Sequence, residues 1–368
     1  MKREKFLFIT TLLVSLFIVA CPKPPEEDDV IVNPYEQHPI DWPSLADSPW
    51  PMYKGNPLNN GLSFIEGPTE GVVEWVLDSI GIGGYGISVD SEGNIYFANN
   101  NGEVFCCNLD GEILWKKQLV QTVAGESRAP IILADNSIAV FLDKSYFQLD
   151  QMGNIIREVI YSNQINSSVV TLDKNGNYYL SFSGELGISS LNNEGNLNLV
   201  IDAPDSLEEH VYSGVFPPIF SPDGNFIYTN TRNHVYKFSI AGELIWTYDT
   251  NTRSSIISDS FGKIYLWNEA DSTFICLTPD GNRDWAFDLG DRDIYEGIAP
   301  SITFEGNILI ALDGNSLMSL SPTGELNWEI VLPTDGGSVI VSAIVSDINS
   351  NIGSVKITGS LFKTSKGI

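Results

Sequence analysis

A glycine followed four positions later by a tryptophan recurs along this chain. The copies begin at Gly71, Gly111, Gly242, Gly281 and Gly324, and the matching tryptophans are Trp75, Trp115, Trp246, Trp285 and Trp328. Gly153 and Gly195 fill the gap between the second and third copies, with Arg157 and Leu199 in place of tryptophan. Successive glycines are separated by 40, 42, 42, 47, 39 and 43 residues. This spacing indicates a chain built from repeated units of about forty residues.

Each unit carries the signals of four short strands. A glycine followed by asparagine recurs upstream of most marker glycines, as at Gly93 and Gly176, and glycine tolerates the positive φ of a tight hairpin turn. β-branched and aromatic residues follow these turns, as in a buried strand. From the second unit onward, an apolar residue stands four places before the marker glycine: Cys107, Leu149, Leu191, Phe238, Leu277 and Leu320. The pattern predicts an all-β fold, a single β-propeller of about seven four-stranded antiparallel blades.

The first and last units are incomplete in complementary ways. No three strands precede Gly71 and Trp75, whereas the strand-like segments 338–348, 354–358 and 361–362 are followed by no tryptophan strand. We therefore expect the N-terminal strand to complete the last blade, which closes the ring and removes exposed strand edges. Because the C-terminal piece fits the repeat poorly, counts of six or eight blades stay open.

The five tryptophans are expected to be structural. A four-stranded sheet cannot bury both of its faces alone, so blades are stable when they stack, and an indole on the outer strand can fill the wedge between neighbours. We assign this blade-docking role to Trp75, Trp115, Trp246, Trp285 and Trp328.

The N-terminus has the features of a bacterial export signal. Lys2, Arg3 and Lys5 precede an uncharged, mostly apolar run over 6–19, which has the length of a signal peptide and is short for a membrane span. The sequence from Ile18 to Cys21 resembles the lipobox of bacterial lipoproteins. That resemblance implies cleavage before Cys21 and acylation of its thiol, and several acyl chains anchor a protein stably to a membrane. The alternative is ordinary secretion with a chance cysteine.

These features divide the chain into four parts. We expect a signal peptide over 1–20, an acidic, proline-rich tether over 21–47, a lead-in segment over 48–70 and the propeller over 71–368. Pro22 stands after the lipid cysteine in place of aspartate, which by analogy with lipoprotein sorting favours the outer membrane. Whether the protein faces the periplasm or the cell surface stays open.

The charge of the mature chain restricts its partners. Without residues 1–20 it carries 17 basic and 46 acidic residues, a net charge of −29. Nucleic acid is excluded as a partner, because binding a polyanion requires a positive surface. The acidity repels anionic lipid headgroups and permits basic partners.

Several patterns that could carry chemistry have ordinary structural explanations. Cys106 and Cys107 are adjacent, but consecutive residues of a strand face opposite sides, which opposes a disulfide between them. Residues 81–86 match a dinucleotide-binding glycine pattern, yet a strand follows where that motif needs a helix. Asp347 begins a calcium-like loop without the glycine and glutamate that such loops require. The 3 histidines are scattered. We assign no catalytic residue, cofactor or metal.

One segment of the repeat carries a family resemblance. Residues 102–115, GEVFCCNLDGEILW, resemble the repeat of pyrroloquinoline-quinone-like propellers, and residues 50–57, WPMYKGNP, with Gly61 are similar to the segment that leads into such rings. The resemblance covers residues 50 to about 330. The superfamily includes quinone-dependent dehydrogenases, some with a disulfide between adjacent cysteines, and cofactor-free members such as the propeller lipoprotein of the outer-membrane β-barrel assembly machinery.

These observations favour a non-enzymatic, lipid-anchored propeller that binds proteins of the bacterial envelope as an assembly scaffold. Two alternatives stay open: a surface-exposed ligand-binding or adhesion module, and a quinone-dependent oxidoreductase. The longest interruptions of the repeat, 121–128 and 202–213, are expected to be contact surfaces.

Overall fold

The computed structural model describes residues 33–67, 73–77, 80, 86–121, 123, 127–166, 169–184, 187–202, 218–252, 254–292, 294, 299–312, 316–331, 344–349, 352–354 and 361–364. The chain divides into two compact units, Met1–Pro34 and Tyr35–Ile368. All of the architecture below belongs to the second unit. Its described residues contain no helix with the length and hydropathy to cross a membrane.

Six four-stranded antiparallel sheets, blades 1 to 6, follow one another along the chain. Blade 1 comprises β2 (Ser88–Val89), β3 (Ile95–Ala98), β4 (Glu103–Cys107) and β5 (Ile113–Gln118). Blade 2 comprises β6 (Ile131–Ile132), β7 (Ile138–Leu142), β8 (Ser145–Leu149) and β9 (Ile155–Ile160). Blade 3 comprises β10 (Thr171–Leu172), β11 (Tyr178–Leu180), β12 (Gly187–Leu191) and β13 (Leu197–Asp202).

Blade 4 comprises β14 (Ile219–Phe220), β15 (Phe226–Asn230), β16 (His234–Ser239) and β17 (Leu244–Asp249). Blade 5 comprises β18 (Ile257–Ser258), β19 (Ile264–Asn268), β20 (Thr273–Leu277) and β21 (Arg283–Asp288), with a short 3-10 helix, η1 (Glu269–Asp271), between β19 and β20. Blade 6 comprises β22 (Ser301–Ile302), β23 (Ile308–Leu312), β24 (Ser316–Leu320) and β25 (Leu326–Val331).

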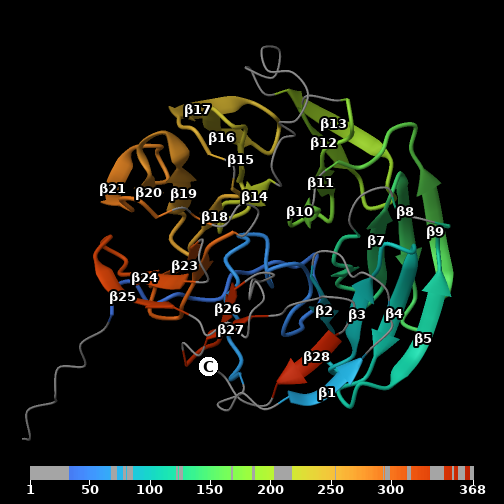
Figure 1. Ribbon diagram of the computed structural model, residues 1–368. Helices are drawn as coiled ribbons and strands as arrows, with labels where there is room; N and C mark the ends of the chain where they lie inside the picture. The colour runs from blue at the N-terminus through green and yellow to red at the C-terminus, as the bar shows by residue number, and fades with distance from the viewer. Residues whose placement is uncertain are drawn as a thin grey trace, which may run out of the picture. The chain divides into compact units, whose positions relative to one another are not determined.

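The blades stand around a common centre. Their first strands, such as β10, β14 and β18, lie nearest that centre, and their fourth strands, such as β9, β13 and β17, lie at the periphery (Figure 1). Burial follows the same order, because the described first strands are largely buried whereas the fourth strands alternate exposed and half-buried residues. The chain is an all-β propeller, as the sequence predicts.

Large side chains fill the space between successive blades. One core cluster contains Tyr146 of blade 2, Tyr178 of blade 3 and Phe220 of blade 4. Another joins Tyr265 of blade 5 to Ile310 of blade 6. Each sheet therefore buries its two faces against its neighbours, which is how a thin sheet becomes stable in a ring.

The remaining strands form two two-stranded sheets, which draw on both ends of the chain and are together called blade 7. β1 (Val73–Leu77) pairs antiparallel with β28 (Leu361–Thr364), and β26 (Ile344–Ser346) pairs with β27 (Ile352–Ser354). In Figure 1, β28 and β1 lie side by side. The prediction that the N-terminal strand closes the ring is confirmed. Together with blades 1 to 6, these four strands agree with a count of seven.

Short turns connect the first strand to the second and the third to the fourth within each complete blade, and all of them are five residues long except 240–243 in blade 4, which has four. In the turn from Asp90 to Asn94, the Asp90 Oδ1 accepts the backbone N–H groups of Glu92 and Asn94 at 2.9 and 2.8 Å. Gly93 has a φ of +86°, which a residue with a side chain rarely adopts. Because successive strands are antiparallel, all of these turns lie at one end of the blades, here called the turn side. The remaining connections lie at the opposite end, the loop side.

The glycine and tryptophan of the repeated motif contact each other across blade boundaries, a tryptophan of one blade with the glycine of another. Four of the five marker tryptophans pack on the marker glycine of the next blade, where an ideal Cβ would come within 2.6 to 2.9 Å of the indole: Trp75 on Gly111, Trp115 on Gly153, Trp246 on Gly281 and Trp285 on Gly324. The indole Nε1 also donates to a backbone carbonyl two residues before that glycine, at 2.7 to 3.1 Å. Any side chain at the glycine would displace the ring. Trp328 lies in β25 of blade 6, and no marker glycine follows it in the sequence.

The two units that lack tryptophan use other residues at this joint. A Cβ at Gly195 would meet Tyr146 at 2.5 Å, and the Tyr161 hydroxyl donates to the Gly195 carbonyl at 2.8 Å. At Gly242 the neighbours are Ile201 and Leu199. Aromatic and aliphatic side chains thus occupy the space that an indole fills elsewhere.

If the tryptophans dock on the marker glycines, replacing a marker glycine with alanine should lower the free energy of unfolding more than the same replacement at a glycine without such a contact. Gly324 and Gly184 have φ values of +83° and +80°, but only a Cβ at Gly324 would strike an indole, at 2.6 Å, whereas a Cβ at Gly184 has nothing within 4 Å. We expect Gly184→Ala to lower the free energy of unfolding by roughly 1–2 kcal/mol from backbone strain alone. Gly324→Ala should cost roughly 2–5 kcal/mol, because overpacking adds to that strain. Urea unfolding of both variants measures the difference, and equal losses would contradict the docking role.

Candidate functional site

The chain crosses the turn side before it enters the ring. Residues 35–47, here called the strap, bind several of the turns there. The Gln37 Oε1 accepts the Ser260 N–H at 2.8 Å, the Trp42 Nε1 donates to the Leu172 carbonyl at 3.0 Å, and the Ser44 hydroxyl donates to the Asp173 carbonyl at 2.6 Å. The sequence assigns these residues to an unpacked tether, yet the described part of it is held against blades 3 and 5.

Residues 50–62, here called the plug, run around the inside of the ring in blade order. Six of their backbone carbonyls accept N–H groups at 2.7 to 3.0 Å. The acceptor and donor pairs are Trp50 with Val89, Pro51 with Ile132, Pro57 with Phe220, Leu58 with Ser258, Asn60 with Ile302, and Gly61 with Ser346. The donors lie in β2, β6, β14, β18, β22 and β26.

These bonds satisfy the inner edges of the blades. The first strand of a blade has a neighbour on one side only, so its other edge would present unpaired backbone groups to the centre. The plug takes up this edge, and its residues Met52, Leu58 and Leu62 are each at most 3% exposed. The centre of the ring is therefore filled by the chain itself.

Lys54 fixes the plug to blade 6. Its ammonium is buried and donates to the backbone carbonyls of Ala299 and Pro300 at 3.0 and 2.9 Å and to the Ser301 hydroxyl at 2.8 Å. Burial lowers the pKa of Lys54 to about 7, because a charge is costly away from water. The three oxygen acceptors favour the charged form and oppose that effect.

The same N-terminal stretch covers both edges of blade 7. Ser346 of β26 exchanges backbone hydrogen bonds with Gly61 and Ser63, and the Gly67 N–H donates to the Asp347 carboxylate at 2.6 Å. A few residues later, β1 forms the outer strand of this blade by pairing with β28. Asp347, the start of the calcium-like loop, thus accepts backbone N–H groups.

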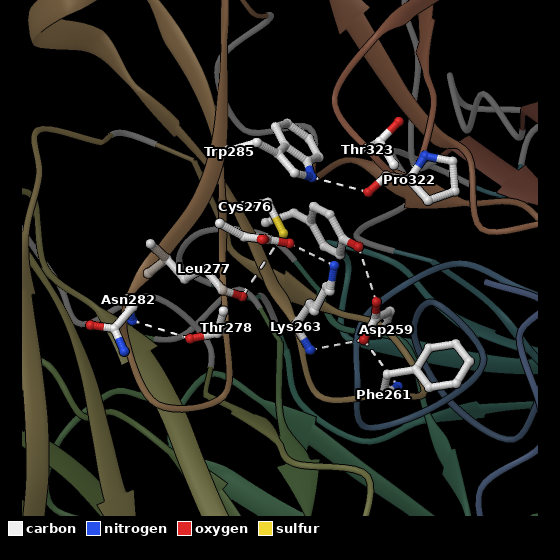
Figure 2. Close-up of polar contacts among 12 residues, drawn as sticks. Asp259, Phe261, Lys263, Cys276, Leu277, Thr278, Asn282, Trp285, Pro322 and Thr323 are labelled. Atoms are coloured by element: carbon white, nitrogen blue, oxygen red, sulfur yellow. Dashed lines mark hydrogen bonds and ion pairs between the residues drawn. The ribbon is translucent and has the colours of Figure 1, made fainter. Parts of the chain in front are cut away.

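A buried polar unit recurs inside the blades. In blade 5 the Asp259 Oδ2 accepts the Tyr265 hydroxyl at 3.0 Å, and Cys276 lies opposite Tyr265 in the sheet. Figure 2 shows Cys276 beside Trp285, its partner in the sheet, whose Nε1 donates to the Pro322 carbonyl of the next blade at 3.0 Å. Burial raises the pKa of Asp259, and two backbone N–H donors oppose this. The unit therefore connects a turn and the core of blade 5 with the contact between blades 5 and 6.

Blades 1 and 3 contain the same arrangement. In blade 1 the Tyr96 hydroxyl donates to Asp90 at 2.9 Å, with Cys106 opposite Tyr96. In blade 3 the Tyr179 hydroxyl donates to Asp173 at 3.4 Å, with a serine opposite. The recurrence across blades identifies this unit as part of the repeat's packing.

The cysteines behave as core residues. Cys106, Cys107 and Cys276 are free and buried. Cys106 lies in the cluster between blades 1 and 2, whereas Cys107 lies in the cluster beside β1, so the adjacent thiols face opposite sides of the sheet as expected. Burial raises the pKa of Cys106 to about 12 and that of Cys107 to about 11. These thiols stay protonated at neutral pH and are not nucleophiles.

The other positions singled out by the sequence have different outcomes. Cys21 lies outside the described residues. In the interruption 121–128, Ser127 and Arg128 are buried, and a guanidinium nitrogen of Arg128 donates to the Ile165 carbonyl, so this part is not a free surface. Of the interruption 202–213 only Asp202 is described. Among the described residues, no three His, Cys, Asp or Glu side chains gather as metal ligands.

Sequence reasoning missed the strap, the plug and Lys54. Prolines and acids between 22 and 47 indicated an unpacked chain, but Trp42 and Trp50 were available signals. A large aromatic side chain is costly to leave in water, so each of these tryptophans predicts that the segment around it is packed.

Comparisons with known proteins agree with this architecture. A family model described as Outer membrane protein assembly factor BamB matches residues 199–360. The chain is a β-propeller, and the matched residues resemble a family of pyrroloquinoline-quinone-like repeats. No curated protein matches this propeller significantly.

Solved propellers of several kinds resemble it. BamB from Moraxella catarrhalis superposes with a TM-score of 0.56 at 14% identity, over 81% of this chain and 92% of that chain. A catalytically inactive virginiamycin B lyase from Staphylococcus aureus, solved with quinupristin, gives 0.59 at 16% identity, over 79% and 98%. The propeller domain of Cps50 (Swd1) from Myceliophteria thermophila gives 0.57 at 10% identity, over 80% and 99%. At such identities the likeness shows the fold alone.

Replacing Lys54 tests the attachment of the plug. Lys54→Met keeps the length of the side chain but leaves the Ala299 and Pro300 carbonyls without this donor. We expect the free energy of unfolding at pH 8 to fall by roughly 2–4 kcal/mol, since each buried unpaired polar group costs about 1–3 kcal/mol. The effect should depend on pH. The folded pKa, about 7, lies below the ordinary lysine value of 10.5, so the unfolded state binds more protons between these values.

Stability should therefore rise from pH 7 towards pH 10 in the wild type relative to Lys54→Met, by roughly 1–4 kcal/mol. Paired urea titrations at pH 7, 8.5 and 10 measure this difference, in which the titration of all other groups cancels. Parallel curves for the two proteins would show that Lys54 keeps an ordinary pKa in the folded state.

Proposed function

We propose that this chain is a non-enzymatic, lipid-anchored propeller that binds proteins of the bacterial envelope and acts as an assembly scaffold. The observation that carries the proposal is the plug. The centre of a ring is where strand ends and loops could surround a small ligand, and here hydrogen-bonded residues of the chain itself fill it. What a partner can reach is the outside of the ring: its two ends and its rim.

The chemistry of the described side chains supports a binding role. The buried carboxylates bind backbone N–H groups and tyrosine hydroxyls within the turns, and the buried thiols are protonated. The adjacent cysteines face opposite sides of β4, which argues against the disulfide that the quinone-dependent alternative would imply. A rigid ring with satisfied internal groups suits the presentation of a fixed surface.

The envelope location rests on the N-terminal sequence. The lipobox-like residues before Cys21 and the apolar run over 6–19 support export and acylation. A net charge of −29 for the mature chain is compatible with a soluble body held near a membrane and with basic protein partners. The family model matched by residues 199–360 describes an assembly factor of the outer membrane, which is consistent with this role.

A crosslinked pull-down tests the function. The chain, tagged at its C-terminus and expressed in its own host, is crosslinked in intact cells with a short amine-reactive reagent and recovered from membranes. We expect defined envelope proteins at stoichiometric levels. Recovery of only extracellular glycans or host proteins would favour the adhesion alternative and contradict the scaffold.

Acylation of Cys21 has a separate test. Cys21→Ser should abolish labelling by a radioactive fatty acid and release the protein from membranes, because no thiol remains at the position where the lipid is attached. Cys276→Ser is the matched control: Cys276 is buried in β20, so labelling and membrane attachment should stay unchanged. Retention of label in Cys21→Ser would exclude the lipid anchor.

A further inference from the structure

The described part of the chain keeps its sulfur atoms away from solvent at every position but one. Met152, in the turn between β8 and β9, is 78% exposed. The other described methionines and cysteines are each at most 1% exposed: Met52, Cys106, Cys107, Cys276 and Met318. Methionine is usually buried, because its apolar side chain gains free energy on leaving water. Met152 makes no use of that gain.

The repeat does not require a methionine at this position. Met152 stands immediately before the marker glycine Gly153. The residues at the same place in the other complete blades are exposed and either polar or small: Asp110, Glu194, Ala241, Asp280 and Thr323. Because five blades form without a thioether here, the packing of the turn does not explain the one in blade 2.

The turn that presents Met152 is held by backbone atoms and by one carboxylate. The Asp150 Oδ1 accepts the backbone N–H groups of Met152 and Asn154 at 2.9 and 2.8 Å. From the preceding blade, the Trp115 Nε1 donates to the Gln151 carbonyl at 2.8 Å. None of these bonds involves the side chain of Met152. A chemical change at its sulfur therefore leaves the turn and the joint between blades 1 and 2 intact.

The two buried methionines are in a different position. Met52 of the plug packs in the cluster that contains Tyr146 and Tyr178, and Met318 packs in the cluster of blades 5 and 6. A sulfoxide is polar, and placing a polar group in an apolar core is costly. Oxidation would therefore disturb the ring at Met52 or Met318 and spare it at Met152.

Thioethers are oxidised by hydroperoxides. A lone pair of the Met152 Sδ attacks the outer oxygen of the hydroperoxide, the O–O bond breaks, and the proton of the outer oxygen passes to the departing oxygen. The products are methionine sulfoxide and water or an alcohol, so sulfur loses the two electrons that the peroxide gains. The described thiols do not compete for the oxidant, because they are buried and protonated.

We propose that Met152 is an oxidation site of this protein, at which hydroperoxides convert the thioether to a sulfoxide without loss of the fold. Sulfoxide reductases return methionine sulfoxide to methionine, and an exposed turn is open to such enzymes. The modification is therefore reversible, and each cycle consumes one hydroperoxide. This inference does not rest on the scaffold function, because it concerns an exposed sulfur whatever the ring binds.

Peroxide treatment followed by site-resolved mass spectrometry tests the proposal. The chain from residue 21 onward, with Cys21→Ser, is exposed to hydrogen peroxide in native buffer and in concentrated urea. In native buffer Met152 should oxidise at least about tenfold faster than Met52 and Met318, whereas in urea the three rates should agree within about twofold. The urea midpoint of the protein oxidised at Met152 should equal that of the untreated protein.

Two variants locate the reaction. Met152→Leu should remove the fast oxidation and leave the urea midpoint unchanged, because the side chain is in solvent. Met318→Leu is the matched control: it conserves volume in the core and should retain the fast oxidation. Treatment of the oxidised wild type with reductases for both sulfoxide epimers should restore the mass of the unmodified protein.

The proposal fails if Met52 or Met318 oxidises as fast as Met152 in native buffer. It also fails if the protein oxidised only at Met152 unfolds at a lower urea concentration, since the reaction would then be damage to the fold. Reductases that leave the sulfoxide of the folded protein unchanged would contradict reversibility. In cells challenged with hydrogen peroxide, sulfoxide should appear at Met152 before Met52 and Met318, and its absence there would show that the oxidant does not reach the site.

Discussion

The ring depends on one repeated contact, in which the indole of one blade lies on the turn glycine of the next. The glycine is needed because any Cβ would overlap the ring, and the indole is needed because it fills the wedge and donates to a backbone carbonyl two residues before that glycine. The recurring phrase in the sequence thus joins two different blades, although its glycine and tryptophan are neighbours along the chain. Where tryptophan is absent, Tyr146 with Tyr161, and Ile201 with Leu199, occupy the same joint.

A second constraint acts at the centre. Short first strands leave backbone groups unpaired on their inner edges, and the plug supplies carbonyl acceptors to six of the seven blades in order. Lys54 adds a side-chain attachment at blade 6. Because the strap and the plug belong to the same N-terminal stretch as β1, this stretch crosses the turn side, fills the ring and closes it. The proposed function accordingly uses the outer surfaces of the ring.

The sequence predicted the architecture more fully than the site. The marker spacing predicted the propeller, and the missing strands at the two ends predicted that β1 would pair with the C-terminal segment, because local patterns report strands directly. The partner of each indole was not predictable in detail, since Trp285 meets Gly324 from another blade. The plug was missed because its bonds use backbone carbonyls, which leave no trace in residue identity.

The plug also constrains how the molecule is made. The plug is among the first parts of the domain to be synthesised, yet one of its partners, Ser346, is among the last. Contacts between residues so distant in sequence form slowly, because a long loop must close before any gain is realised. An unfinished chain therefore lacks the hydrogen bonds between the plug and the C-terminal strands and leaves strand edges unpaired. Such intermediates are prone to aggregate. Folding is therefore expected to end in a late step that depends on synthesis of the C-terminal strands, so a chaperone would have to protect the incomplete ring until then.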